Sequence, residues 1–109
     1  MILQDINNLP DFQIACGGDT SLAVTDVFCC DMLSLAMSKG IEGAAWVTVM
    51  GGVNTLAVLR LTEMSCIILA EGVKPDEVMK QKATEEGITV FTTDLSVFQT
   101  ALKIHEALS

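Results

Sequence analysis

Four apolar runs at nearly regular spacing organise this chain. They begin near Leu22, Ala44, Ser65 and Ile88, at separations of 22, 21 and 23 residues, and each leads through a small or acidic turn into a helical pattern. These separations match the length of a compact strand–helix unit, although the residues of the four units do not align well with one another. We therefore interpret the repetition as repeated architecture rather than as recent duplication.

The four runs predict strands that are buried on both faces of a sheet. Their side chains alternate only partly between apolar and polar, which is typical of a parallel sheet covered by helices. They are short, rich in Val, Ile, Thr and Phe, and span Leu22–Cys30, Ala44–Met50, Ser65–Ala70 and Ile88–Thr92. We expect these four strands at the centre of a mainly parallel sheet.

Helical patterns follow the runs, over Met32–Ser38, Val53–Thr62, Pro75–Glu86 and Leu95–Leu108. In the third pattern, Pro75 stands at the first helical position and Gly87 is placed to end the helix. The last pattern is the most regular, and Asp94 is placed to cap it. Its expected apolar stripe consists of Leu95, Phe98, Ala101, Leu102, His105 and Leu108.

The first 21 residues differ from the repeating units. Leu3–Leu9 predicts a short helix, Phe12–Cys16 an additional strand, and Gly17–Asp19 a turn. No linker divides the chain, so we expect a single domain over residues 1–109, with 1–21 as an N-terminal extension of the core and 22–109 as four strand–helix units. This order predicts an α/β fold, a three-layer sandwich around a mainly parallel sheet of about five strands, with right-handed crossovers.

Charge and apolar content argue against several classes of protein. Fourteen acidic residues against six basic ones give a net charge of −8, which opposes binding to nucleic acid or to an anionic membrane surface. The longest apolar stretches, such as Cys66–Ala70, are far below the roughly 18 residues of a membrane span. The start, Met1–Asp5, lacks the basic segment and long apolar run of a signal peptide, so we expect a cytoplasmic protein.

The four cysteines are expected to be free thiols that serve as small hydrophobic residues. Cys16, Cys29, Cys30 and Cys66 lie in or beside apolar runs, and none forms a C-x-x-C pair. The neighbours Cys29 and Cys30 would point to opposite faces of a strand, which makes a poor metal chelate, although a metal or redox role stays open. Because His105 is the only histidine, no nucleophile–histidine arrangement stands out, and we expect no catalytic residue, metal site or cofactor.

The turns at the carboxyl ends of the strands are the expected binding region, because ligands of open α/β sheets collect there. The segment Met50–Thr55 follows the second run, and its glycine pair lets backbone amides approach a ligand. The helix that follows adds free N–H groups and the positive end of its dipole. The segment is neither a Walker motif nor G-x-G-x-x-G, and the alternative is a tight turn with Asn54 or Thr55 as the helix cap.

The corresponding turns of the other units gather at the same edge if the sheet is parallel. They add acids, and Lys74 is the only obvious cation among them, so we expect a ligand of modest negative charge or a nucleotide carried with a divalent cation. The alternative is that the acids only cap helix N-termini. The predicted ligand-binding residues are Asp31, Gly51, Gly52, Asn54, Glu71, Gly72, Thr93 and Asp94.

Short motifs are spread over roughly residues 20–108, namely Asp31–Ser34, Ala45–Thr48, Asn54–Val58, Ile67–Leu69, Lys74–Glu77, Glu85–Ile88 and Thr93–Ser96. Together they resemble the small stand-alone DRTGG-domain proteins. The resemblance implies a fold similar to the N-terminal domain of HPr kinase. The contiguous letters Asp-Arg-Thr-Gly-Gly do not occur, so no binding residue is carried over from the family. Nor does the resemblance extend to the HPr kinase catalytic domain, so it implies no kinase activity.

The resemblance also bears on function, since DRTGG domains accompany CBS domains and phosphotransacetylases. It implies a regulatory or ligand-sensing role, and it links the small members to iron-only hydrogenases and energy metabolism in anaerobic bacteria. Our leading hypothesis is a non-catalytic regulatory module that binds a small molecule, such as a nucleotide, or a protein partner. The alternatives are a small enzyme or redox or metal accessory protein that uses Asp31, Asp94 or the cysteines, and a structural partner domain.

Self-association is a further expectation. Half of the residues are apolar, and a chain of this length has limited interior in which to bury them. Surplus apolar surface commonly marks an interface, and twofold dimers are the commonest closed assembly. We therefore expect a homodimer, with the N-terminal segment Ile2–Ile14 as a contributor because it lies outside the repeating units.

Overall fold

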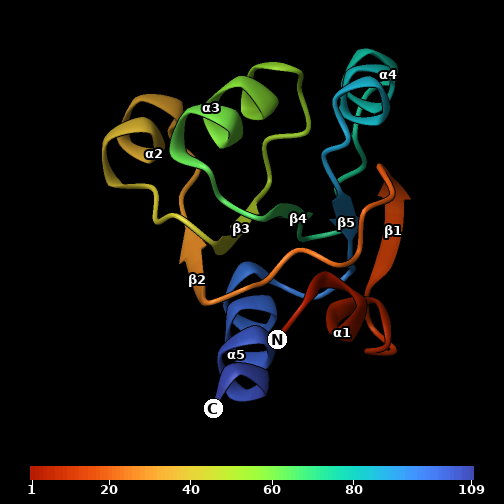
Figure 1. Cartoon of the computed structure of the whole chain (residues 1–109), viewed down its shortest axis with the longest axis vertical. Helices are drawn as coiled ribbons and strands as arrows, with labels where there is room; N and C mark the ends of the chain where they lie inside the picture. Colours follow the sequence, from red (N-terminus) through yellow and green to blue (C-terminus); the bar gives the residue numbers. More distant parts are fainter.

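A mainly parallel sheet of five strands, in the order β1-β5-β4-β3-β2, organises the computed structural model, which describes residues 1–109 (Figure 1). Strands β2 to β5 are parallel to one another, and β1 pairs antiparallel with β5. The strands are β1 (Gln13–Cys16), β2 (Asp26–Cys29), β3 (Ala44–Thr48), β4 (Cys66–Leu69) and β5 (Val90–Thr92). The expected α/β fold with a mainly parallel sheet is confirmed.

Helices cover both faces of the sheet, as expected for a three-layer sandwich (Figure 1). One layer holds α2 (Leu33–Lys39), α3 (Asn54–Thr62) and α4 (Glu77–Glu86), and the other holds α1 (Leu3–Asn7) and α5 (Val97–Leu108). None of these helices combines the length and the apolar character that a membrane span requires.

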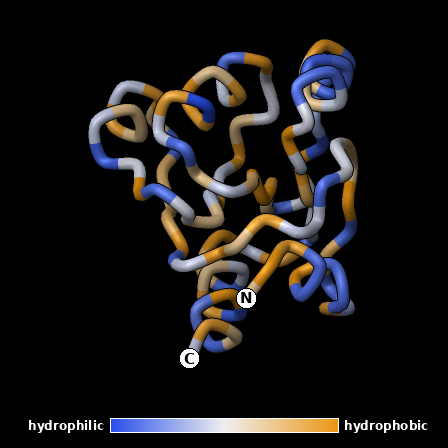
Figure 2. The backbone as a smooth tube through the Cα atoms, viewed as in Figure 1, coloured by the Kyte–Doolittle hydropathy of each residue, from blue (hydrophilic) through white to orange (hydrophobic).

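The core consists of two apolar clusters separated by the sheet. Every residue of β3 and β4 is buried, so the side chains of these strands alternate between the two clusters. The cluster under α2, α3 and α4 includes Ala36, Trp46, Leu56, Ile67, Leu69, Met79 and Ala83. The cluster against α1 and α5 includes Leu3, Ile6, Val47, Ile68, Phe91 and Ile104. Figure 2 shows α4 mostly in hydrophilic blue, because Glu, Lys and Gln make up most of this helix; only its Met79 and Ala83 are buried.

The first predicted strand is shorter than expected and lies at an edge of the sheet instead of its centre. Only Asp26–Cys29 of the run Leu22–Cys30 pairs with β3, whereas Ala23 forms an isolated bridge with Ile2. The N-terminal segment pairs with β5 at the opposite side of the sheet, so no strand pairs with the outer edge of β2. On β2, the Val27 N–H donates to Asp26 Oδ1 at 2.8 Å.

Two helix starts differ from the sequence prediction because other side chains cap them. Ser96, not Asp94, caps α5: its Oγ accepts from the Gln99 N–H at 3.1 Å, and Gln99 Oε1 accepts from the Ser96 N–H at 3.2 Å. This reciprocal pair satisfies two free amides at once. In α4, Asp76 Oδ1 accepts from the Met79 N–H at 2.8 Å, which leaves Pro75 outside the helix.

The buried face of α5 is also rotated from the expected stripe. Thr100 and Ile104 are fully buried against the sheet, whereas Phe98 is 72% and Leu102 is 42% exposed, and His105 is exposed as well. Two overlapping series with helical spacing run along this helix, and both satisfy the same periodicity. The sheet selects the series of Thr100 and Ile104 and leaves Phe98 and Leu102 on the outer surface.

The homodimer stays a prediction, and the structure indicates an exposed surface at which it can be tested. Leu3 and Ile6 of the N-terminal segment are buried in their own chain, whereas Phe98 and Leu102 form an exposed apolar pair on α5. We expect light scattering at high micromolar concentration to give twice the 11.6 kDa chain mass, and Phe98→Glu to reduce it to one chain. Val78→Glu, an exposed apolar position on α4, serves as the control. A wild-type monomer contradicts the prediction.

Candidate functional site

The parallel strands bring all eight predicted ligand-binding residues to one edge of the sheet, on the turns that follow β2, β3, β4 and β5. Backbone hydrogen bonds join neighbouring turns there. The Asp76 N–H donates to the Gly51 carbonyl at 3.0 Å, and the Gly72 N–H donates to the Thr93 carbonyl at 3.0 Å. The edge is therefore a continuous surface of linked turns, as the sequence predicted for a parallel sheet.

Two of the predicted acids are engaged in holding this edge together. Asp31 Oδ1 accepts from the buried Thr48 hydroxyl at 2.8 Å and from the Val49 N–H at 3.0 Å, which ties the end of β2 to that of β3. Glu71 Oε2 accepts from the Val97 N–H at 3.0 Å at the start of α5. The contact of Glu71 fits the alternative, in which the acids cap helix N-termini, whereas Asp31 bonds the end of a strand instead of a helix.

The glycine pair after β3 has two different roles. A Cβ on Gly51 would lie 2.7 Å from the Lys74 carbonyl oxygen, so this residue lets the turn after β3 approach the segment after β4. A Cβ on Gly52 would meet only Asp76 Oδ2, at 3.8 Å. Gly51 is thus required for packing, whereas Gly52 faces open space.

The start of α3 offers fewer free amides than expected. The Thr55 and Leu56 N–H groups donate to the Gly52 and Val53 carbonyls, both at 3.1 Å. Neither Asn54 nor Thr55 caps the helix: Asn54 is exposed, and the Thr55 hydroxyl donates to the Met50 carbonyl at 2.9 Å. The helix terminus alone is therefore a weak anion site.

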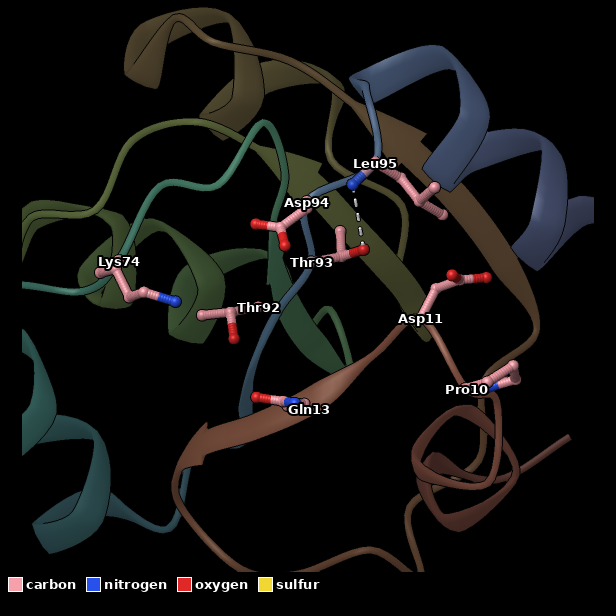
Figure 3. Close-up of a pocket in the computed structure, with 8 residues that line it drawn as sticks. All are labelled: Pro10, Asp11, Gln13, Lys74, Thr92, Thr93, Asp94 and Leu95. Carbon is pink, nitrogen blue, oxygen red and sulfur yellow. Dashed lines mark hydrogen bonds between the residues drawn. The ribbon is translucent and has the colours of Figure 1, made fainter.

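A polar cavity of about 220 Å³ opens beside β5 at this edge (Figure 3). Thr93 and Asp94 are the only members of the predicted set that line it. The sequence analysis did not predict the lining residues of the N-terminal segment, which are Pro10, Asp11 and Gln13. No short sequence motif indicates that β1 pairs antiparallel with β5 and so brings them to this edge. The lining residues are Pro10, Asp11, Gln13, Lys74, Thr92, Thr93, Asp94 and Leu95.

The polar groups of this cavity are only partly paired within the chain. Lys74 takes part in none of the four ion pairs of the molecule, and the Thr92 hydroxyl is accessible from the cavity and makes no side-chain hydrogen bond within the chain. In contrast, Asp11 Oδ2 lies 3.1 Å from Lys103 Nζ on α5, and Thr93 Oγ1 accepts from the Leu95 N–H at 3.2 Å. The free groups are those that a ligand can use.

Of the other predicted ligand-binding residues, Asn54 also lines a cavity. It lines a separate cavity of about 170 Å³ between α3 and α4, beside the ion pair of Arg60 with Glu86. This ion pair occupies both charged groups, and the cavity lies apart from the turns that carry Thr93 and Asp94.

The cysteines are free thiols in three environments. Burial raises the pKa of Cys66 and of Cys16. The pKa of Cys29 is also raised, by partial desolvation first and then by the charges of Asp31 and Cys30. Cys30 donates through Sγ to the Met32 carbonyl at 3.4 Å. No group of three or more His, Cys, Asp or Glu residues is arranged to hold a metal ion.

We expect thiol labelling to separate these environments. A disulfide reagent at pH 8 should modify Cys29 and, more slowly, Cys30 in the native protein, whereas Cys16 and Cys66 react only after unfolding. Because its pKa is raised, the reaction rate of Cys29 should still increase as the pH rises above 9. Counting released chromophore with and without denaturant tests this, and Cys29→Ser is the control that should remove the fast phase. Rapid native labelling of all four thiols contradicts the assignment.

The glycine pair gives a matched stability test. Gly51→Ala should lower the free energy of unfolding by about 1–3 kcal/mol, because the added methyl group meets backbone atoms that cannot move independently. Gly52→Ala should change it by less than about 0.5 kcal/mol. Urea denaturation followed by circular dichroism measures both. Equal losses in the two variants would show that the close approach at Gly51 is unimportant.

Comparison with known proteins identifies the family. The DRTGG domain matches residues 5–107, and no curated protein matches the sequence. A solved structure of similar fold is the regulatory region of Clostridium perfringens pyrophosphatase, with CBS and DRTGG domains in complex with the activator diadenosine tetraphosphate (TM-score 0.58, 19% identity, 84% of this chain). This chain spans 40% of that one. Since the match covers nearly its whole length, the chain belongs to the DRTGG domain family.

Proposed function

We propose that this chain is a non-catalytic regulatory domain that senses a nucleotide at the carboxyl edge of its sheet. The observation that carries the proposal is the polar cavity beside β5, where Lys74 and the accessible Thr92 hydroxyl lack side-chain partners within the chain. A hydroxyl that faces a cavity and bonds no group of its own chain is free to donate to a ligand and to accept from it. Membership of the DRTGG family supports the regulatory role.

The nucleotide class is supported by the structural neighbour, which is a regulatory region in complex with diadenosine tetraphosphate. The proposed binding surface has Thr93 and Asp94 at its centre. Along the same edge it extends over the other predicted residues, which are Asp31, Gly51, Gly52, Asn54, Glu71 and Gly72. In this proposal the domain works in the cytoplasm as a homodimer, and its pathway is the hydrogenase-linked energy metabolism that the resemblance implies.

A non-catalytic role is supported by how the reactive side chains are used. The Asp31 and Glu71 carboxylates accept backbone N–H bonds and so hold the end of β3 and the start of α5 in place. The only histidine, His105, is exposed on α5 and does not line the cavity. A cavity lined by polar side chains without a histidine or a cysteine is suited to binding rather than to turnover.

A thermal-shift screen of adenine nucleotides, with and without Mg²⁺, tests the proposal. A ligand at about 100 times its Kd stabilises the native state by about 2.7 kcal/mol, which corresponds to a rise in Tm of about 10 °C for a domain of this size. Chromatography of the nucleotide after incubation should show no product. Absence of any shift, or conversion of the nucleotide, contradicts the proposal.

Two matched glycine variants test whether the nucleotide binds at the turn after β3. Gly52→Val should weaken binding of the best nucleotide without unfolding the domain, since the position has space and adopts no positive φ. Gly18→Val is the control: this glycine also has open space around it, but it follows β1 at the opposite edge of the sheet. Equal affinity in the two variants places the ligand away from the turn after β3.

A further inference from the structure

The cavity beside β5 has two chemically different ends (Figure 3). Lys74, Thr92 and Gln13 form one end, and Figure 3 shows their side chains directed toward the same space. Asp11 lies at the other end with its carboxylate directed toward α5, and the carboxylate of Asp94 is directed toward Thr92 and Lys74. A ligand bound at the donor end therefore meets the Asp94 carboxylate beside these donors.

The donor end is suited to a single anionic group. Lys74 supplies the only cation of the cavity, and its main chain is held in place because its carbonyl oxygen lies against Gly51. Gln13 and Thr92 are direct partners across the antiparallel pair of β1 and β5, so their side chains lie on the same face of the sheet. An ammonium, an amide and a hydroxyl in this arrangement can bind the oxygens of one phosphoryl group.

The acceptor end is suited to hydroxyl groups. Asp94 is exposed, and none of its carboxylate oxygens takes part in the ion pairs of the molecule. Asp11 shares its carboxylate with Lys103 of α5. An acidic side chain near a nucleotide commonly accepts hydrogen bonds from the ribose hydroxyls. The same carboxylates repel additional phosphoryl groups.

The size of the cavity sets a further limit. Its volume of about 220 Å³ is below the roughly 300–1,000 Å³ of sites that enclose a drug-sized molecule. A sugar phosphate fits this space, whereas a complete dinucleotide does not. The base of a nucleotide bound here would lie outside the cavity, along the linked turns of the edge.

From these observations we infer that the cavity binds the ribose-phosphate part of a nucleoside monophosphate. The phosphoryl group lies at Lys74, Gln13 and Thr92, and the sugar hydroxyls donate to Asp94. This inference rests on the proposed nucleotide-sensing function and specifies its ligand. One cation and two nearby acids select against diphosphates and triphosphates in the absence of a divalent cation.

Calorimetry with AMP, adenosine and ATP tests the inference in the full chain without Mg²⁺. AMP should bind at least about tenfold more tightly than adenosine or ATP, since a hydrogen bond to a charged group is worth about that factor. Lys74→Ala should remove the preference of AMP over adenosine, and Thr92→Val should weaken AMP about three- to tenfold. Lys39→Ala is the control, because Lys39 is the other lysine without an ion pair and lies away from this edge.

Shift mapping by NMR with ribose 5-phosphate separates this inference from the proposed function. Shifts at the Gln13, Thr92 and Asp94 amides with both ribose 5-phosphate and AMP support the inference. It is overturned if ribose 5-phosphate and AMP leave these amides unchanged, or if ATP or diadenosine tetraphosphate binds more tightly than AMP. It is also overturned if Lys74→Ala keeps the preference for AMP over adenosine. If ATP or diadenosine tetraphosphate binds more tightly than AMP, or if Lys74→Ala keeps the preference, this inference fails but the proposed nucleotide-sensing function stands.

Discussion

Burial of both faces of β3 and β4 is the constraint on which the rest of the structure depends. Every residue of these two strands is buried, so neither face can be left to solvent without exposing part of the core. Parallel neighbours also need crossover connections, and helices that cross over cover the faces of the sheet. The same connections return β2 to β5 in one direction, which places the turns that follow these strands at a single edge. The helical crossovers between parallel strands thus both cover the core and gather the turns of the site at one edge.

The acids at this edge illustrate how the structure divides residues that look equivalent in the sequence. Asp31, Glu71 and Asp76 each accept a backbone N–H, and they join strand ends or cap helices. Asp94 has no such role, because Ser96 has taken the cap of α5. The negative charge expected at the edge is therefore largely committed to structure. What remains for a ligand is concentrated at the cavity, where Asp94 and Lys74 are free.

Local patterns in the sequence predicted the features that depend on local physics. The runs that became β3, β4 and β5, and the edge that gathers Thr93 with Asp94, follow from apolar content and strand–helix alternation. The orientation of α5 does not, since the series through Phe98 and the series through Ile104 have the same spacing. Only contact with the sheet distinguishes them. Likewise, the pairing of Gln13 with Thr92 joins residues nearly 80 positions apart, and no short motif encodes it.

The N-terminal segment also connects the cavity to the outer surface of the molecule. Asp11 lines the cavity and pairs with Lys103, which is next to the exposed Leu102 on α5. The start of the same helix is held by Glu71 and follows Leu95, which is itself a lining residue. A ligand that bonds the Asp11 carboxylate competes with Lys103 for it. A regulatory ligand must interact differently with two states of the protein, and the states with and without this ion pair would differ in that way. Because α5 is joined to the cavity lining by the ion pair of Lys103 with Asp11 and also faces solvent, it is the element of this fold best placed to transmit occupancy to a partner.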